Sequence, residues 1–216
     1  MKMNIRRFNW LRKLVYIWRG IEECHSYTKG KGNHVCLKGV KVSSHIQIDG
    51  NENRIICEKD SLLKDTTIKV KGNKNTITLR EGCYVSGAEI WVADNDCKVE
   101  IGERTFVGHH THLACVEDNS ELIIGSDGML SSYIQVRTSD SHHILDMDGN
   151  RINPAQSVYI GDHVWIGQGV RVMKGVRLEG DDIVSTGAIV TKSFDKNVLI
   201  GGIPAKVLKE GVTWKS

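Results

Sequence analysis

From Ile160 onward, aliphatic residues recur at every sixth position of the chain. They are Ile160, Ile166, Val172, Leu178, Val184 and Val190, and a second series with the same spacing comprises Val164, Val170 and Val176. A period of six would place successive side chains on opposite sides of an α-helix, and a strand alone repeats every two residues. One short strand and one corner fit six residues, so that three units close a coil of about 18 residues, which stacks on the next coil. The pattern predicts an all-β solenoid with three faces.

The middle of the chain shows a longer version of this repeat. Polar tetrapeptides recur 21 to 24 residues apart, each followed by alternating apolar positions, at 50–53 (GNEN), 72–75 (GNKN), 93–96 (ADND) and 117–120 (EDNS). Asn and Asp tolerate left-handed backbone and can hydrogen-bond along a stack of corners. We therefore expect coils in which one corner is enlarged. The next such corner falls at Asp140, beside two histidines.

Two segments depart from the repeat. Residues 144–157 (ILDMDGNRINPAQS) are too polar and too long for a corner, which predicts a protruding loop. Residues 4–23 place apolar side chains at helical spacing opposite a basic face. This helix could cap the open first coil, or residues 1–23 could contact an anionic membrane surface. We divide the chain into an N-terminal segment 1–30, a solenoid 31–209 and a C-terminal tail 210–216.

Composition and charge narrow the class of protein. The 216 residues, 40% of them apolar, suit one folded domain, and no run of about 18 apolar residues could span a bilayer. A net charge of +3 gives no basis for nucleic-acid binding. The six cysteines form no CxxC pair, and the N-terminus lacks the apolar stretch of a signal peptide. We expect reduced, buried thiols in a cytoplasmic protein, placed at the inner face of the membrane if the N-terminal helix binds lipid.

The hexads and two further motifs resemble the hexapeptide-repeat acyltransferases. The segments INPAQSVYIGDHVWIGQGV (152–170) and GGIPAKVLK (201–209) are similar to sugar O-acetyltransferases, and the resemblance covers about residues 31–209. It implies a left-handed parallel β-helix, although parallel crossovers are normally right-handed. It also implies a homotrimer with active sites between subunits and acetyl-CoA as the acyl donor. The implied reaction acetylates a hydroxyl of a capsule, lipopolysaccharide or other glycan sugar, without a covalent acyl-enzyme.

The resemblance also suggests a catalytic base. In this family a single histidine after a Ser/Asp-rich stretch takes the proton of the acceptor hydroxyl, and His142 in SDSH occupies that place. An imidazole with a pKa near about 6.5 suits this task. His143 is the alternative base, and a solvated turn histidine is the non-catalytic interpretation of either residue. Asp140 is a candidate acceptor-binding residue.

The donor side follows from the same resemblance. Trp165 matches a tryptophan beside the pantetheine arm and the acceptor, and Gln168 matches a CoA-contacting position that is serine in the galactoside enzymes. Lys206 and Lys209 match two arginines that hold the adenosine phosphates, so that charge is kept while bidentate geometry is lost. The segment STGAIVTK (185–192) resembles one that lines the CoA groove, which assigns to the cofactor Thr186, Gly187, Ala188, Thr191 and Lys192.

Three other functions are compatible with the sequence. The same base and groove would serve an amine, which makes an N-acetyltransferase on an amino sugar the main alternative. His109, His110 and His112 look like a metal cluster, and the same fold houses a γ-class carbonic anhydrase that binds zinc through three histidines. We expect no metal here, because a third ligand at that family's spacing is lacking. The remaining alternative is a non-catalytic scaffold.

Overall fold

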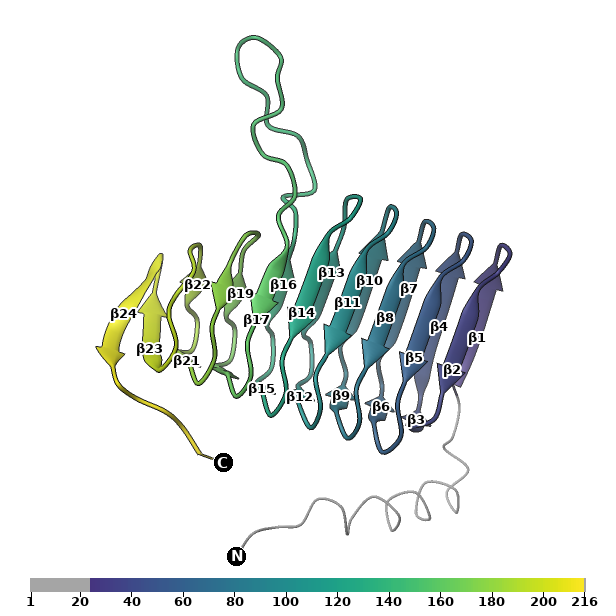
Figure 1. Cartoon of the computed structure of the whole chain (residues 1–216), viewed down its shortest axis with the longest axis horizontal. Helices are drawn as coiled ribbons and strands as arrows, with labels where there is room; N and C mark the ends of the chain where they lie inside the picture. The colour runs from purple at the N-terminus through teal and green to yellow at the C-terminus, as the bar shows by residue number, and fades with distance from the viewer. Residues whose placement is uncertain (1–23, 216) are drawn as a thin grey trace, which may run out of the picture.

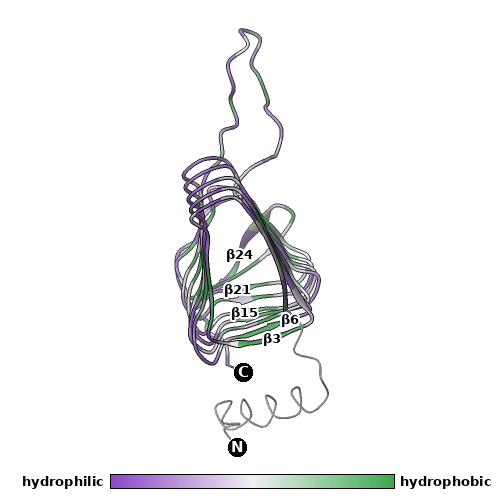
Figure 2. Ribbon diagram, turned by 90° about the vertical axis from the view of Figure 1, so that its right-hand side faces the viewer, coloured by the Kyte–Doolittle hydropathy of each residue, from purple (hydrophilic) through white to green (hydrophobic). Residues whose placement is uncertain are grey.

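The chain folds into a three-sided solenoid of stacked coils (Figure 1). The computed structural model describes residues 24–215. Each coil contributes one strand to each face before the chain advances to the next coil. Figure 2 shows the coils end-on as a triangle, with one long loop projecting from a corner. The repeats predict this all-β solenoid with three faces, and the family resemblance predicts its form as a left-handed β-helix.

The strands described within residues 24–215 form three sheets, whose members follow in their order of pairing. The first sheet comprises β1 (Cys24–Lys29), β4 (Ser44–Asp49), β7 (Thr67–Lys71), β10 (Glu89–Ala93), β13 (His112–Cys115), β16 (Gln135–Arg137), β19 (Arg171–Val172) and β22 (Ile189–Val190). The second comprises β2 (His34–Leu37), β5 (Arg54–Cys57), β8 (Thr76–Leu79), β11 (Lys98–Ile101), β14 (Glu121–Ile124), β17 (Val158–Ile160) and β20 (Arg177–Leu178). The third comprises β3 (Val40–Val42), β6 (Leu62–Lys64), β9 (Tyr84–Ser86), β12 (Phe106–Val107), β15 (Met129–Leu130), β18 (Trp165–Ile166), β21 (Ile183–Val184), β23 (Val198–Gly202) and β24 (Ala205–Glu210).

The core is a column of aliphatic side chains from all three sheets. In the first sheet, Ile46, Ile68 and Ile90 stand in register on successive strands and are at most 1% exposed. The six-spaced residues that predict the fold are all buried, as are those of the second series. Successive side chains on a strand point alternately to the core and to solvent, so each two-residue strand buries one aliphatic side chain. Removal of this apolar surface from water is the main source of stability.

Two ladders of side-chain amides stabilise the enlarged corner between the first and second sheets. In the outer ladder, Asn51 N–H donates to Asn73 Oδ1 (2.9 Å), Asn73 N–H to Asn95 Oδ1 (3.1 Å), and Asn95 N–H to Asp118 Oδ1 (2.8 Å). The inner ladder runs the other way, from Asn75 N–H to Asn53 Oδ1 (3.0 Å). The predicted stacking of polar corners is thereby confirmed.

Glycine is required at one point of each early corner. Gly50 has φ +146° and Gly72 has φ +131°, and a Cβ at Gly50 would lie 1.8 Å from the carbonyl oxygen of Gly72. The next coil places Asp94 there with φ +71°. The coils can therefore stack closely only because these positions tolerate left-handed backbone.

The predicted loop at 144–157 is confirmed between β16 and β17, at the same corner as the ladders (Figure 1). The predicted N-terminal helix lies outside the described residues. Residues 24–29, placed in the N-terminal segment from the sequence, form β1 of the first coil. At the other end, β24 runs antiparallel to β23 and extends to Glu210, which the sequence places in the tail.

Two smaller features complete the fold. Cys57, Cys83, Cys97 and Cys115 are buried, as predicted, whereas Cys36 is only half-buried, and burial raises the pKa of Cys83. In the described part of the chain, no helix has the length and apolar character needed to cross a bilayer.

Candidate functional site

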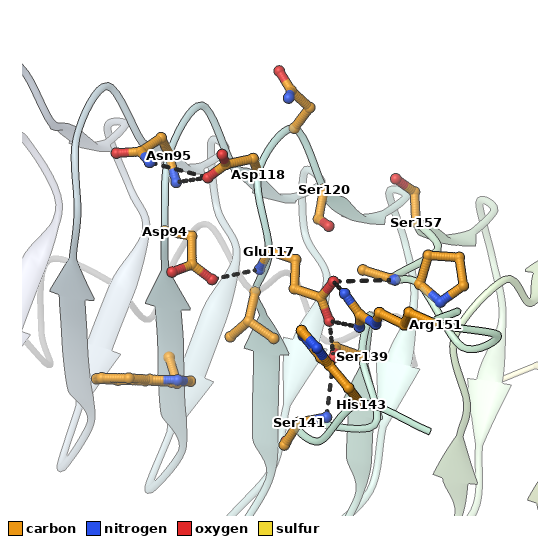
Figure 3. Close-up of a pocket in the computed structure, with 15 residues that line it drawn as sticks. Asp94, Asn95, Glu117, Asp118, Ser120, Ser139, Ser141, His143, Arg151 and Ser157 are labelled. Atoms are coloured by element: carbon orange, nitrogen blue, oxygen red, sulfur yellow. Dashed lines mark hydrogen bonds and ion pairs between the residues drawn. The ribbon is translucent and has the colours of Figure 1, made fainter. Parts of the chain in front are cut away.

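A groove of ≈ 830 Å³ lies at the base of the projecting loop. It extends across three consecutive coils, because its lining comes from the corners after β10, β13 and β16 and from the return segment before β17. Figure 3 shows acidic and hydroxyl side chains around it, with one arginine and one histidine. The labelled lining residues are Asp94, Asn95, Glu117, Asp118, Ser120, Ser139, Ser141, His143, Arg151 and Ser157.

An ion pair fixes one side of the loop base. Arg151 donates two hydrogen bonds to the Glu117 carboxylate, each 2.6 Å long, from its two terminal nitrogens (Figure 3). Ser139 Oγ donates a further short hydrogen bond to the same carboxylate. The hydrogen bonds from Arg151 lower the pKa of Glu117 to about 2, so the carboxylate is ionised at neutral pH. The pair therefore joins the corner that follows β13 to the returning half of the loop, which contains Arg151.

A second set of polar contacts fixes the other side. Asp140 Oδ2 accepts hydrogen bonds from Lys174 Nζ (2.6 Å) and Asn153 Nδ2 (2.9 Å). The bond from Lys174 lowers the pKa of the Asp140 carboxyl. Asn153 also donates to the carbonyl of His142 (2.8 Å) and accepts from the amide of Ile144 (2.7 Å). Asp140, predicted to bind the acceptor, thus has Oδ2 engaged in holding the loop.

These contacts position both candidate bases. His142 and His143 are exposed, and His143 lines the groove (Figure 3). The backbone of His142 is held by Asn153, whose side chain is buried within the loop base. The polar network therefore fixes the backbone at His142 next to a hollow that is lined by His143 and by hydroxyl and carboxylate groups, which suits binding of a polyhydroxylated ligand.

The predicted donor residues lie on other parts of the prism. Trp165, 39% exposed, lies on β18 of the third sheet, and Lys206 and Lys209 are exposed on β24 at the edge of that sheet. Gln168 and Thr186 are exposed at the corner between the third and first sheets, where Gly187 N–H donates to the Gln168 carbonyl (2.8 Å). This stacking brings part of the predicted CoA-binding set together.

The other three members of that set lie elsewhere. Thr191 and Lys192 follow β22, at the corner between the first and second sheets, and both are exposed. Ala188 is 1% exposed, so its methyl group packs in the core. The Ala188 side chain therefore cannot contact the cofactor. Only the backbone of Ala188 remains available for the contact that the sequence assigned to this residue.

Within one chain the predicted base does not converge with Trp165, Gln168, Lys206 and Lys209, whereas Thr191 and Lys192 lie at the same corner as the loop, two coils further on. The loop with His142 leaves the corner between the first and second sheets, whereas Trp165 projects from the third sheet. The hexad repeat itself explains this, because each corner turns the chain to a new face after one short strand.

Trp214 is an aromatic neighbour of Trp165 that the sequence analysis missed. Its ring stacks on His163 with 4.5 Å between centroids, and its Nε1 donates to the His163 carbonyl (2.7 Å). Its centroid lies 6.1 Å from that of Trp165. His163 is held in turn by Asp181 (2.8 Å). The sequence feature that could have indicated this contact is a single tryptophan outside the repeats, at position 214.

The three histidines of the metal alternative have separate neighbours. His109 Nε2 lies 3.3 Å from Ser86 Oγ, the His110 ring stacks on Tyr133 at 4.7 Å, and His112 is half-buried on β13. Between residues 24 and 215, no three His, Cys, Asp or Glu side chains are grouped so that they could hold a metal ion.

Three similarities to known proteins illustrate the relationships of the chain. The chain is 29% identical over 195 residues to a polysialic acid O-acetyltransferase of Neisseria meningitidis, which covers 88% of this chain and 89% of that protein. It is 35% identical over 124 residues to a polysialic acid O-acetyltransferase of Escherichia coli O1:K1, covering 57% of this chain but only 40% of that protein's length. The crystal structure of the polySia-specific acetyltransferase NeuO superposes with a TM-score of 0.83 at 28% identity, over 89% of each chain. No protein-family model matches the chain.

Proposed function

We infer that this chain, which belongs to the hexapeptide-repeat family of left-handed β-helix acyltransferases, is an acetyl-CoA-dependent O-acetyltransferase that modifies a glycan. The observation that supports this most directly is the similarity to a polySia-specific acetyltransferase over 89% of both chains. The relatives named above act on polysialic acid, which makes a sugar hydroxyl the acceptor we propose.

In the proposed mechanism His142 is the general base. Its imidazole takes the proton of the acceptor hydroxyl while the oxygen attacks the thioester carbonyl of acetyl-CoA. The tetrahedral oxyanion collapses by breaking the carbon–sulfur bond, and the imidazolium returns the proton to the departing thiolate. The products are an acetyl ester and free CoA. Proton transfer of this kind contributes typically ~10²–10⁴-fold to the rate.

The donor side of the proposal follows the family resemblance. Trp165 would pack beside the thioester arm, with Gln168 and the backbone at Gly187 on the neighbouring corner. Lys206 and Lys209, which are exposed on β24, would bind the phosphates of the adenosine. Thr191 and Lys192 would contribute from the corner that follows β22.

We propose that the active enzyme is a homotrimer with each site shared between two copies. Two observations support this arrangement. The predicted base lies on a different part of one prism from Trp165, Lys206 and Lys209. The projecting loop also exposes four apolar side chains, which would be covered by an adjacent copy. Their exposed fractions are 52% for Ile144, 55% for Leu145, 101% for Met147 and 60% for Ile152.

The location of the enzyme is also a proposal. Acetyl-CoA is a cytoplasmic metabolite, and the cysteines of the described residues, which form no disulfide, suit a reducing compartment. We place the enzyme in the cytoplasm, at the inner face of the membrane if the basic segment 1–23 binds anionic lipid. Cosedimentation with vesicles of anionic and of neutral lipid, using the full chain and a form lacking residues 1–23, tests the membrane contact.

The function is tested by supplying acetyl-CoA with three acceptors: sialic acid oligomers, neutral oligosaccharides and amino-sugar oligomers. We expect release of free thiol with a glycan acceptor, and a product whose acetyl group is removed by alkaline hydroxylamine, as that of an oxygen ester is. A hydroxylamine-resistant product would identify N-acetyl transfer instead. Absence of thiol release with all three acceptors, from protein that is folded by circular dichroism, would contradict the proposal.

A further inference from the structure

A second hollow lies on the outward face of the first sheet and adjoins the groove at the loop base. The two hollows share Trp91, Val116, Ser139 and Ser141 in their linings. The lining of the second is completed by Glu89, His112, Ala114 and Arg137. The surface at the base of the loop is therefore longer than one sugar unit needs, because it continues from the corner onto the flat of the sheet.

The shape of this second hollow follows from the strand register. Trp91 on β10 pairs with Ala114 on β13, and Ala114 pairs with Arg137 on β16. Adjacent strands lie about 4.8 Å apart, so Trp91 and Arg137 stand roughly 10 Å apart with only a methyl group between them. The Trp91 indole and the Arg137 guanidinium thus flank a depression over Ala114 that is about as wide as one sugar ring.

The two flanking side chains lack polar partners. Among residues 24–215, neither the Trp91 indole nor the Arg137 guanidinium makes a side-chain hydrogen bond or an ion pair, although both are half-buried. Arg151 and Arg104, by comparison, are each paired with carboxylates. A guanidinium without an ion-pair partner keeps its donors available for a carboxylate.

The carboxylates near Arg137 form their ion pairs with other cations, although Asp140 also interacts electrostatically with the Arg137 guanidinium. Glu89, the carboxylate in the hollow, is already paired with Lys69 at 2.8 Å. Asp140, the acidic residue on the loop side, is paired with Lys174 at 2.6 Å. His112 adds no positive charge beside Arg137, because burial lowers its pKa and favours the neutral ring.

We propose that the hollow formed by Trp91, Ala114 and Arg137 binds an acidic sugar unit of the acceptor glycan. The apolar face of the sugar ring packs on the indole, and the sugar carboxylate pairs with the Arg137 guanidinium. Ser139 and Ser141 connect this hollow to the groove lined by His143, so that a neighbouring unit of the same glycan chain lies at the loop base. This inference rests on the proposed function and specifies the acceptor as a carboxylated glycan.

The test measures binding in the absence of acetyl-CoA, by isothermal titration with two ligands. The probes are α2,8-linked sialic acid oligomers and the same oligomers with their carboxylates reduced to alcohols. For Arg137→Gln we expect about ten- to hundredfold weaker binding of the carboxylated oligomer, and unchanged binding of the reduced one. Trp91→Ala should weaken both, and Trp91→Phe should retain part of the affinity. Arg54→Gln, the same change at an exposed arginine on β5, is the matched control and should bind like wild type.

Transfer kinetics supply the second measurement. Arg137→Gln should raise KM for the carboxylated oligomer by a similar factor while kcat stays near the wild-type value. Equal binding of the carboxylated oligomer by Arg137→Gln and wild type would overturn the inference. So would equal affinity of the wild-type chain for the two oligomers. Selective binding without any acetyl transfer would refute the proposed function and leave the acidic-sugar site standing.

Discussion

The two histidines at the loop base have different surroundings although they are adjacent in the chain. Asn153 holds the backbone carbonyl of His142, and the side chain of His143 lines the groove. Neighbouring side chains on extended backbone point to opposite sides, so only one imidazole can reach a given hydroxyl. The family resemblance favours His142, while the geometry of a single chain places His143 in the groove. Matched substitutions separate the two roles.

The first prediction concerns these residues. His142→Ala should lose most of kcat, because the hydroxyl then has no base, while the dissociation constant of CoA stays nearly unchanged. His143→Ala is the matched control and should retain most activity. Steady-state transfer rates and CoA titration measure both effects. If His142→Ala kept more than about a tenth of kcat, its share of barrier lowering would be below ~1.4 kcal/mol, too little for a general base.

A second prediction concerns Asp182, a buried carboxyl group beneath β23. It accepts hydrogen bonds from the amides of Gly180 (3.3 Å) and Val198 (3.2 Å), yet burial raises its pKa to about 6. In the unfolded chain its pKa is about 3.9. Between these two pH values the folded state holds more protons than the unfolded state, so the free energy of unfolding falls as pH rises from about 4 to about 6.

Above about pH 6 this contribution of Asp182 levels off. Urea unfolding over this range should therefore show a decline of about 3 kcal/mol in the free energy of unfolding, which Asp182→Asn removes. Asp195→Asn, at an exposed position after β22, is the control and should keep the wild-type dependence. An identical pH profile for Asp182→Asn and wild type would contradict the raised pKa.

At the scale of elements, the sequence predicts the strands and corners that recur with the repeat. It does not predict contacts that occur once, between segments far apart in the chain. The buried aliphatic residues and the polar corners recur with a regular period, so that each repeat strengthens the prediction of the next one. Val172 in the core and Asn73 in a corner can therefore be placed from the sequence alone. The contact between Glu117 and Arg151 spans 34 residues, and that between His163 and Trp214 spans 51. No period connects these pairs, because a loop and a tail return to the solenoid by tertiary packing.

The loop gives the third prediction. Glu117→Gln removes the charge that Arg151 pairs with, so the loop base should open while the aliphatic core stays intact. We expect a loss of kcat of about tenfold or more, since a misplaced catalytic group is costly, and faster hydrogen exchange at residues 139–143. Glu103→Gln breaks a similar exposed pair with Arg104 away from the groove and should change neither quantity. Wild-type exchange rates in Glu117→Gln would show that the ion pair does not position the loop.

At the scale of the whole molecule, the solenoid separates the parts that the chemistry must bring together. Its three faces place the loop with His142 and the strand with Lys206 and Lys209 on different parts of the prism. A rigid column of packed side chains cannot fold over to unite them. An adjacent copy can, and the exposed apolar side chains of the loop provide a surface for the contact.

Mixing of two inactive chains tests this arrangement. His142→Ala lacks the base, and the double variant Lys206→Ala with Lys209→Ala lacks the phosphate contacts, so each alone should be nearly inactive with acetyl-CoA at low concentration. In a trimer that shares each site, random mixing pairs an intact histidine with intact lysines at about one interface in four. Coexpression of the two variants should therefore restore about a quarter of the wild-type rate. The variants purified separately and mixed without subunit exchange are the control and should stay inactive. Coexpressed chains no more active than that control would mean that each chain builds its site from its own residues.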